Sequence, residues 1–133
     1  MGDYLSGLPA FAAWLGLSLG LLVAFVGLYV TVTPPSEIRL IRQGNVSAAL
    51  CLGGAMLGFA LPLASAMVHG SNLVDFLIWG LIAAVVQVLS YVASRLIFRR
   101  MAADIVEDHV ATAVITAAIA LTVGVLNAAA MFG

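Results

Sequence analysis

The chain has 133 residues, of which 64% are hydrophobic and only 8% are charged. A soluble domain carries roughly a quarter charged residues, so this composition excludes a soluble fold and predicts an integral membrane protein. All basic charge comes from five arginines and the formal net charge is −1, which gives no reason to expect nucleic acid as a partner.

The first long apolar segment extends from Pro9 to Val32. A helix of about 20 apolar residues crosses a bilayer, so this segment is long enough to span the membrane. The preceding residues, Met1 to Tyr4, lack the basic region of a signal peptide, and we expect the segment to be retained. Because lipid cannot hydrogen-bond a free backbone, each spanning segment should be a continuous helix.

The first connection, residues 33–45, predicts a short helix lying on the membrane surface. Pro34 and Pro35 end the first span, because proline lacks an amide hydrogen and restricts the residue before it. Ser36 is a suitable N-cap and Gly44 a suitable left-handed stop, which leaves about two turns of helix between them. Asn45 is placed to cap the second span. The intervening helix carries apolar Ile38, Leu40 and Ile41 and charged Glu37, Arg39 and Arg42.

Three further apolar segments follow: Val46 to Val68, Leu73 to Phe98, and Val110 to Phe132. Each is long enough to span. Asn72 and Asp75 stand three positions apart at the start of the third span, a spacing typical of a capping box. Capping gives Asp75 a structural explanation, and proton or ion handling is the alternative. The sequence therefore predicts an all-α membrane protein of four transmembrane helices joined by short connections.

The arginines predict how the chain is oriented. Arg39 and Arg42 lie in the first connection, Arg99 and Arg100 lie in the third, and Arg95 precedes the third by one turn. The N-terminus, the second connection and the C-terminus carry neither Lys nor Arg. Positive charge is retained in the cytoplasm, so the first and third connections should be cytoplasmic and both termini should lie on the opposite side.

A weak internal repeat of about 64 positions relates residues 45–49 to residues 109–113. It predicts two tandem helical hairpins, about residues 8–69 and 72–133, within a single four-helix transmembrane domain covering residues 1–133. Each copy holds an even number of spans, so both copies keep the same orientation. A pseudo-twofold axis along the membrane normal should relate them.

Small and polar residues mark the faces that we expect to pack, because lipid supplies little hydrophobic drive for helix association. These faces are either interfaces of a compact bundle or homo-oligomer, or the lining of a pathway. Gln87, Asn127 and Pro62 lie at depth and are the candidate pathway residues. The third span places Gly80, Ala83, Gln87, Ser90 and Ser94 on one helix face. The candidate packing positions are Gly16, Gly20, Gly54, Gly58, Gly80 and Gly124.

The sequence predicts no catalytic, cofactor or metal site. The serines lack histidine and carboxylate partners at matching depth, and there is no glycine-rich phosphate loop. His69 and His109 fall at opposite membrane faces, so one chain cannot bring both to a metal or a haem. No charged residue lies near the middle of a span, which weighs against proton-coupled transport and voltage sensing.

Short motifs that carry a family resemblance are spread over almost the whole chain. They are Thr33-Pro34, Glu37 with Leu40 to Asn45, Ala48-Ala49, Gly54, Leu57 to Ser65, Trp79 to Ala83, Val86 to Leu89, and Gly124 to Ala129 with Met131. Together they resemble the YjfL-like bacterial inner-membrane family, also called DUF350 or UPF0719. The resemblance implies duplicated two-helix units in the bacterial inner membrane and an unassigned role. In such a membrane the arginine pattern places both termini in the periplasm. Association with envelope-maintenance and polyamine-related proteins is a further implication. Ala130 departs from the family, which often has cysteine there.

We therefore expect a non-enzymatic, oligomeric inner-membrane protein that serves as a membrane scaffold or docking partner in envelope maintenance. Glu37, Arg39, Arg42 and Asn45 form the candidate docking surface for a cytoplasmic protein or anionic lipid. For the two arginines, simple positive-inside anchoring is the alternative. The alternative function is a small oligomeric channel or passive permeation pathway for ions or polyamine-like solutes, lined by the faces of Gln87 and Asn127.

Overall fold

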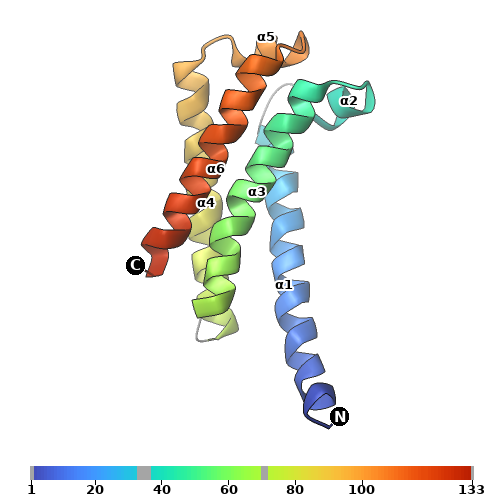
Figure 1. The fold of residues 1–133 in the computed structure, drawn as a ribbon, viewed down its shortest axis with the longest axis vertical. Coiled ribbons are helices and arrows are strands. Elements are labelled where there is room, and N and C mark those ends of the chain that lie inside the picture. The colour runs from blue at the N-terminus through green and yellow to red at the C-terminus, as the bar shows by residue number, and fades with distance from the viewer. Residues whose placement is uncertain (1, 33–36, 70–71, 133) are drawn as a thin grey trace.

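The computed structural model describes residues 2–32, 37–69 and 72–132, and every regular element in these ranges is a helix (Figure 1). Four helices are long and apolar enough to cross a membrane, as the sequence predicts. The predicted short helix between the first two spans is also present, whereas a second short helix, α5, was not predicted. The helices are α1 (Gly2–Val32), α2 (Glu37–Arg42), α3 (Val46–His69), α4 (Leu73–Ile97), α5 (Met101–Val106) and α6 (Val110–Phe132).

Helices α3 and α6 form the central pair and lie side by side along most of their length (Figure 1). Their backbones approach closely at glycine. A Cβ added at Gly54 would lie 2.7 Å from the Cα of Ala117, and one added at Gly58 would lie 2.5 Å from the carbonyl oxygen of Ala120. At Gly124 an added Cβ would overlap the backbone of Gly58. Only residues without a side chain allow this crossing, which is the small-residue packing expected between membrane helices.

Pro62 lies within α3 and is fully buried. Proline has no amide hydrogen, so the carbonyl of Gly58, four residues earlier, lacks its usual helical donor. That carbonyl oxygen is the atom nearest to the Gly124 position on α6. The proline and the two glycines therefore belong to one packing arrangement at the α3–α6 crossing.

Helix α4 packs against both members of the central pair. Its buried residues are Phe76, Gly80, Ala83, Gln87, Ser90 and Ser94. The face predicted from three- and four-residue spacing is thus the buried face of the helix. At its start, the Asn72 side chain accepts a hydrogen bond from the Asp75 amide at 2.8 Å, so the predicted N-cap is confirmed.

Helix α1 contacts the bundle along one face through aromatic pairs. Phe25 stacks on Phe59 of α3 with ring centroids 4.4 Å apart, and Trp14 meets Phe76 of α4 edge to face at 5.3 Å. Toward its N-terminus α1 diverges from the other spans (Figure 1). Gly16 and Gly20 have no other atom within 4 Å of an added Cβ. Within one chain they are therefore not packing positions, unlike Gly54, Gly58, Gly80 and Gly124.

We expect Gly124→Ala to destabilise the bundle by about 1–3 kcal/mol, because the added methyl group would force α3 and α6 apart. Gly16→Ala is the matched control: its methyl group meets open space, so the change should be neutral or slightly stabilising through helix propensity. Thermal unfolding in a mild detergent that keeps the chain monomeric, followed by circular dichroism, measures both. Equal stability of the two variants would contradict the close crossing.

Candidate functional site

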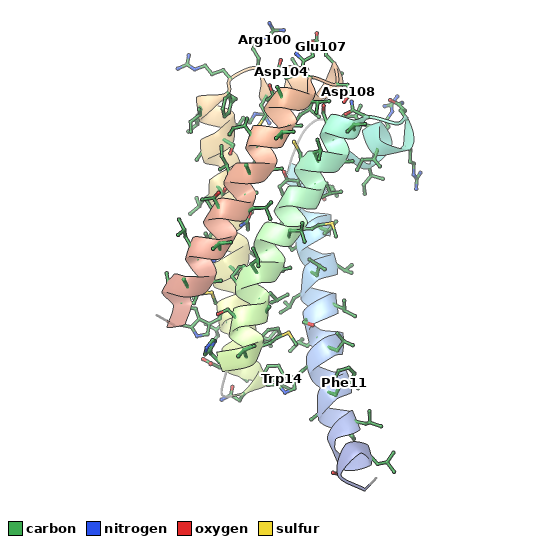
Figure 2. All side chains as sticks on the ribbon, viewed as in Figure 1. Phe11, Trp14, Arg100, Asp104, Glu107 and Asp108 are labelled. Carbon is green, nitrogen blue, oxygen red and sulfur yellow. The ribbon has the colours of Figure 1, made fainter. Side chains whose placement is uncertain are left out.

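One end of the bundle carries both short helices and most of the charge, and we call residues 37–45 and 98–109 the arginine face (Figure 2). Arg39, Arg42, Arg99 and Arg100 are all exposed on it. Among the described residues, none of these four side chains forms a hydrogen bond or an ion pair. Within the described part of the chain they are therefore exposed cations without an acidic partner.

The arginine face is built from two turns with the same backbone geometry. In each, a residue with positive φ lies two positions after the end of a short helix. It is Gly44, with a φ of 86°, after α2 and Asp108, with a φ of 58°, after α5. The Gly44 stop predicted from sequence is therefore confirmed. The same hydrogen bonds close the two turns at positions 64 apart: Gly44 N to Ile41 O at 2.9 Å and Asp108 N to Ile105 O at 3.0 Å, then Asn45 N to Leu40 O at 2.9 Å and His109 N to Asp104 O at 2.7 Å.

Asn45 joins the two turns. Its Oδ1 accepts from the amide of Ala48 at 2.8 Å, which caps α3 as predicted. Its Nδ2 donates to the carbonyl of Ile105 at 2.7 Å, at the end of α5. The oxygen and the nitrogen of the carboxamide are both hydrogen-bonded within the chain. These contacts support a structural role for Asn45.

Asp108 caps α3 from the turn that precedes α6. Its Oδ1 accepts from the Ser47 hydroxyl at 2.7 Å and from the Ser47 amide at 2.9 Å. These two hydrogen bonds lower the pKa of Asp108, and burial opposes the shift only in part. A carboxylate at a helix N-terminus also interacts favourably with the helix dipole. The ionised form of Asp108 therefore holds the second turn against the first span of the central pair.

His109, Asp104 and Glu107 form a cluster on the outer side of the second turn. The Nδ1 of His109 lies 3.4 Å from Asp104, and its Nε2 lies 3.4 Å from Glu107. A metal ion binds one ring nitrogen of a histidine, whereas here the two carboxylates face opposite nitrogens. One ligand atom from each of the three residues lies within 4.8 Å of the other two, but exposed acidic groups commonly lie this close without an ion. Asp104 also accepts from the Thr112 hydroxyl at 3.0 Å.

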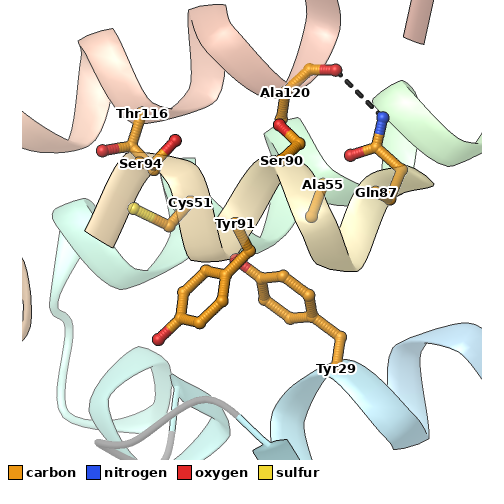
Figure 3. A pocket seen from close by; sticks show the side chains of 9 residues that line it. All are labelled: Tyr29, Cys51, Ala55, Gln87, Ser90, Tyr91, Ser94, Thr116 and Ala120. Carbon is orange, nitrogen blue, oxygen red and sulfur yellow. Dashed lines mark hydrogen bonds between the residues drawn. The ribbon is translucent and has the colours of Figure 1, made fainter. Parts of the chain in front are cut away.

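Inside the bundle, the polar face of α4 lines a small chamber (Figure 3). Gln87, 2% exposed, donates from Nε2 to the carbonyl of Ala120 at 3.1 Å. The amide fits there because Gly58 has no side chain: an added Cβ would lie 2.8 Å from that nitrogen. Gln87 therefore has a structural role, because its hydrogen bond joins α4 to α6. The residues lining the chamber are Tyr29, Cys51, Ala55, Gln87, Ser90, Tyr91, Ser94, Thr116 and Ala120.

Aromatic and basic side chains lie between the chamber and the arginine face. Tyr29 of α1 and Tyr91 of α4 meet edge to face, with centroids 5.6 Å apart. The hydroxyl of Tyr91 accepts from the guanidinium of Arg95 at 3.0 Å, one turn before the end of α4. Polar groups therefore follow one another on α4 from the middle of the span to its end.

Toward the opposite end, α3 and α6 are joined by Ser65, whose hydroxyl donates to the carbonyl of Ala128 at 3.1 Å. The neighbouring Asn127 has a buried Nδ2 without a hydrogen-bond partner among the described residues. Together with the buried Pro62, these residues face the interior of a single chain. The Glu37 side chain and residues 33–36, including the predicted cap Ser36, lie outside what the structure describes.

The sequence comparisons place the chain in a family. Residues 3–131 match the family model described as Domain of Unknown Function (DUF350). The chain belongs to the DUF350 family. It is 32% identical over 127 residues to the UPF0719 inner membrane protein YjfL of Escherichia coli K12 and to the protein of the same name in strain O157:H7, with 96% of each chain covered. No solved structure matched the chain.

This DUF350 chain is thus an inner-membrane protein by family and composition, as its sequence resemblance implied. Two features of its arginine face were missed by the sequence reasoning, α5 and the capping role of Asp108. The repeat of 64 positions could have indicated α5, because it relates residues 37–42, which form α2, to residues 101–106. No local pattern indicates the second, since Asp108 caps a helix that begins 62 positions earlier.

We expect the stability contributed by Asp108 to depend on pH. Because its pKa is lowered below 3.8 by Ser47, the contribution is complete above about pH 5 and is lost as the pH falls through 3.8 and below. Asp108→Asn keeps an acceptor oxygen and tolerates positive φ but carries no charge. The difference in melting temperature between wild type and variant should therefore shrink on acidification. A difference that stays constant between about pH 6 and pH 3 would contradict the assignment.

Proposed function

We propose that this DUF350 protein is a non-enzymatic, oligomeric scaffold of the inner membrane whose arginine face lies in the cytoplasm and docks a protein with an acidic surface. The observation that carries the proposal is the pair Arg39 and Arg42 on α2, exposed and unpaired among the described residues. The distribution of arginine between the ends of the spans supports the cytoplasmic orientation.

The rigidity of the neighbouring turn supports α2 as the docking element. Gly44 ends the helix in a left-handed conformation, and Asn45 ties the turn to α3 and to α5. Arg39 and Arg42 are therefore presented from a short, fixed helix. A pre-organised surface loses less conformational entropy when a partner binds. Envelope maintenance is the setting that the family resemblance suggests for such a scaffold.

Oligomerisation is part of the same proposal. In the apolar 18-residue window of α1, only 11% of the residues are buried within the chain, and the share in α6 is the same. Gly16 and Gly20 leave the exposed side of α1 open to a close helix approach. In lipid, small residues on an open helix face favour association with another helix.

The docking hypothesis predicts that Arg39→Gln with Arg42→Gln lowers partner capture several-fold. A photo-reactive amino acid at the exposed Gln43, activated in native membranes, measures the capture of protein neighbours. Arg99→Gln with Arg100→Gln is the matched control, because it removes the same charge from the same face but leaves α2 unchanged.

If both pairs reduce cross-linking equally, general attraction to anionic lipid is the better explanation, at roughly 1 kcal/mol per arginine. If neither pair changes cross-linking or lipid retention while membrane insertion is preserved, α2 is not a docking surface. Reporter fusions at both ends of the chain test the orientation in the same membranes.

A second candidate is passive permeation of ions or polyamine-like solutes, which the succession of polar side chains along α4 favours. Gln87 is buried inside its own chain, and so is the Nδ2 of Asn127. A path that uses these side chains would therefore run through each subunit. A pore between subunits would need the polar face of α4 on the subunit surface, whereas α3 and α6 cover that face.

Permeation predicts that the purified protein in liposomes conducts potassium or putrescine, and that Gln87→Leu lowers this flux at least several-fold. Thr122→Val is the control, because Thr122 is exposed on α6 and bonds only to its own helix at Ala118. Absence of flux above empty liposomes, from protein shown to be inserted and folded, would exclude this candidate and leave docking.

A further inference from the structure

The chamber on the buried face of α4 contains polar atoms that the protein leaves unsatisfied. Ser90 is 7% exposed and Ser94 is 1% exposed. Among the described residues, neither hydroxyl forms a hydrogen bond, and the Oε1 of Gln87 has none either, since its bond to Ala120 uses Nε2. All three side chains line the chamber (Figure 3). Leaving such groups without a partner in an apolar interior costs free energy.

The size of the chamber limits what can satisfy these groups. The volume open to the centre of a water-sized sphere is about 10 Å³. This is close to the smallest space that holds one water molecule, and it is too small for an organic ligand. The neighbouring small side chains of Ala55 and Ala120 create the space without filling it.

We propose that the chamber binds a single ordered water molecule in the membrane interior, hydrogen-bonded to Ser90 and to its neighbours on the same helix face. A water molecule supplies two donors and two acceptors, which matches hydroxyls that both donate and accept and a carboxamide oxygen that accepts. Buried waters of this kind make two to four hydrogen bonds to groups that the protein leaves unpaired.

The chemistry of the lining favours water over a dehydrated cation of similar size. No acidic residue lines the chamber, so a cation would have no counter-charge within the membrane. The nearest charged group along the polar face, Arg95, is itself positive and hydrogen-bonded to Tyr91. A neutral ligand carries no such electrostatic cost.

Hydroxyl-radical footprinting by synchrotron radiolysis in ¹⁸O-labelled water tests the proposal on the full chain in nanodiscs. Radicals form where water is bound, so buried side chains beside it become labelled. Rates are divided by those of the same residues in the unfolded chain. We expect Cys51, which lines the chamber and is 2% exposed, to be labelled several-fold faster than Phe76, which is 0% exposed in the apolar core.

Ser90→Val fills the chamber and removes a hydroxyl, so it should reduce the labelling of Cys51 to the level of Phe76. Ser18→Val is the matched control, since Ser18 is also 7% exposed but lies outside the chamber, with its hydroxyl bonded to Leu15. Labelling in wild type no faster than at Phe76 would overturn the proposal without any variant. Unchanged labelling in folded Ser90→Val would also overturn it.

Discussion

The close crossing of α3 and α6 sets the geometry of the described bundle. The backbone of Gly124 lies against the carbonyl of Gly58, and Gly54 lies against Ala117. In lipid the burial of apolar side chains does not drive helix association, so contact distance and weak backbone interactions decide stability. Pro62 contributes by leaving the Gly58 carbonyl without its helical donor at the point where the helices meet. Any side chain at these positions would separate the pair.

The position of α4 and the polar chamber follow from the same crossing. Gly58 gives space to the amide of Gln87 as well as to α6, so one missing side chain serves two contacts. Gln87 can then reach the carbonyl of Ala120 and tie α4 to α6. Farther along α4 toward the arginine face, Ser90 and Ser94 are too short to make an equivalent bond across the interface. The space between the three helices is a consequence of this decrease in side-chain length along one helix face.

Local rules predicted much of this arrangement from sequence. The spans, α2, the Gly44 stop, the caps at Asn45 and Asn72 and the buried face of α4 each depend on neighbouring residues. The non-local features were not predictable in this way. Asp108 caps a helix that is distant in the sequence, and its role depends on how the turn after α5 meets the start of α3. Likewise, spacing marked Gly16 and Gly20 as small-residue positions, but only the path of α1 shows that no described residue covers them.

The two turns of the arginine face have the same backbone conformation but differ in their side-chain contacts. A left-handed conformation is unfavourable for a residue with a Cβ, and glycine avoids the cost in the first turn. Asp108 accepts that cost in the second turn, and its two hydrogen bonds to Ser47 offset it. The second turn thereby consolidates the bundle, with His109 and its acidic neighbours engaged beside it. The first turn is held by Asn45, and the side chains of Arg39 and Arg42 form no hydrogen bond or ion pair among the described residues. Because the hydrogen bonds of Asn45 fix the turn that follows these arginines, α2 is the element at which to look for a partner.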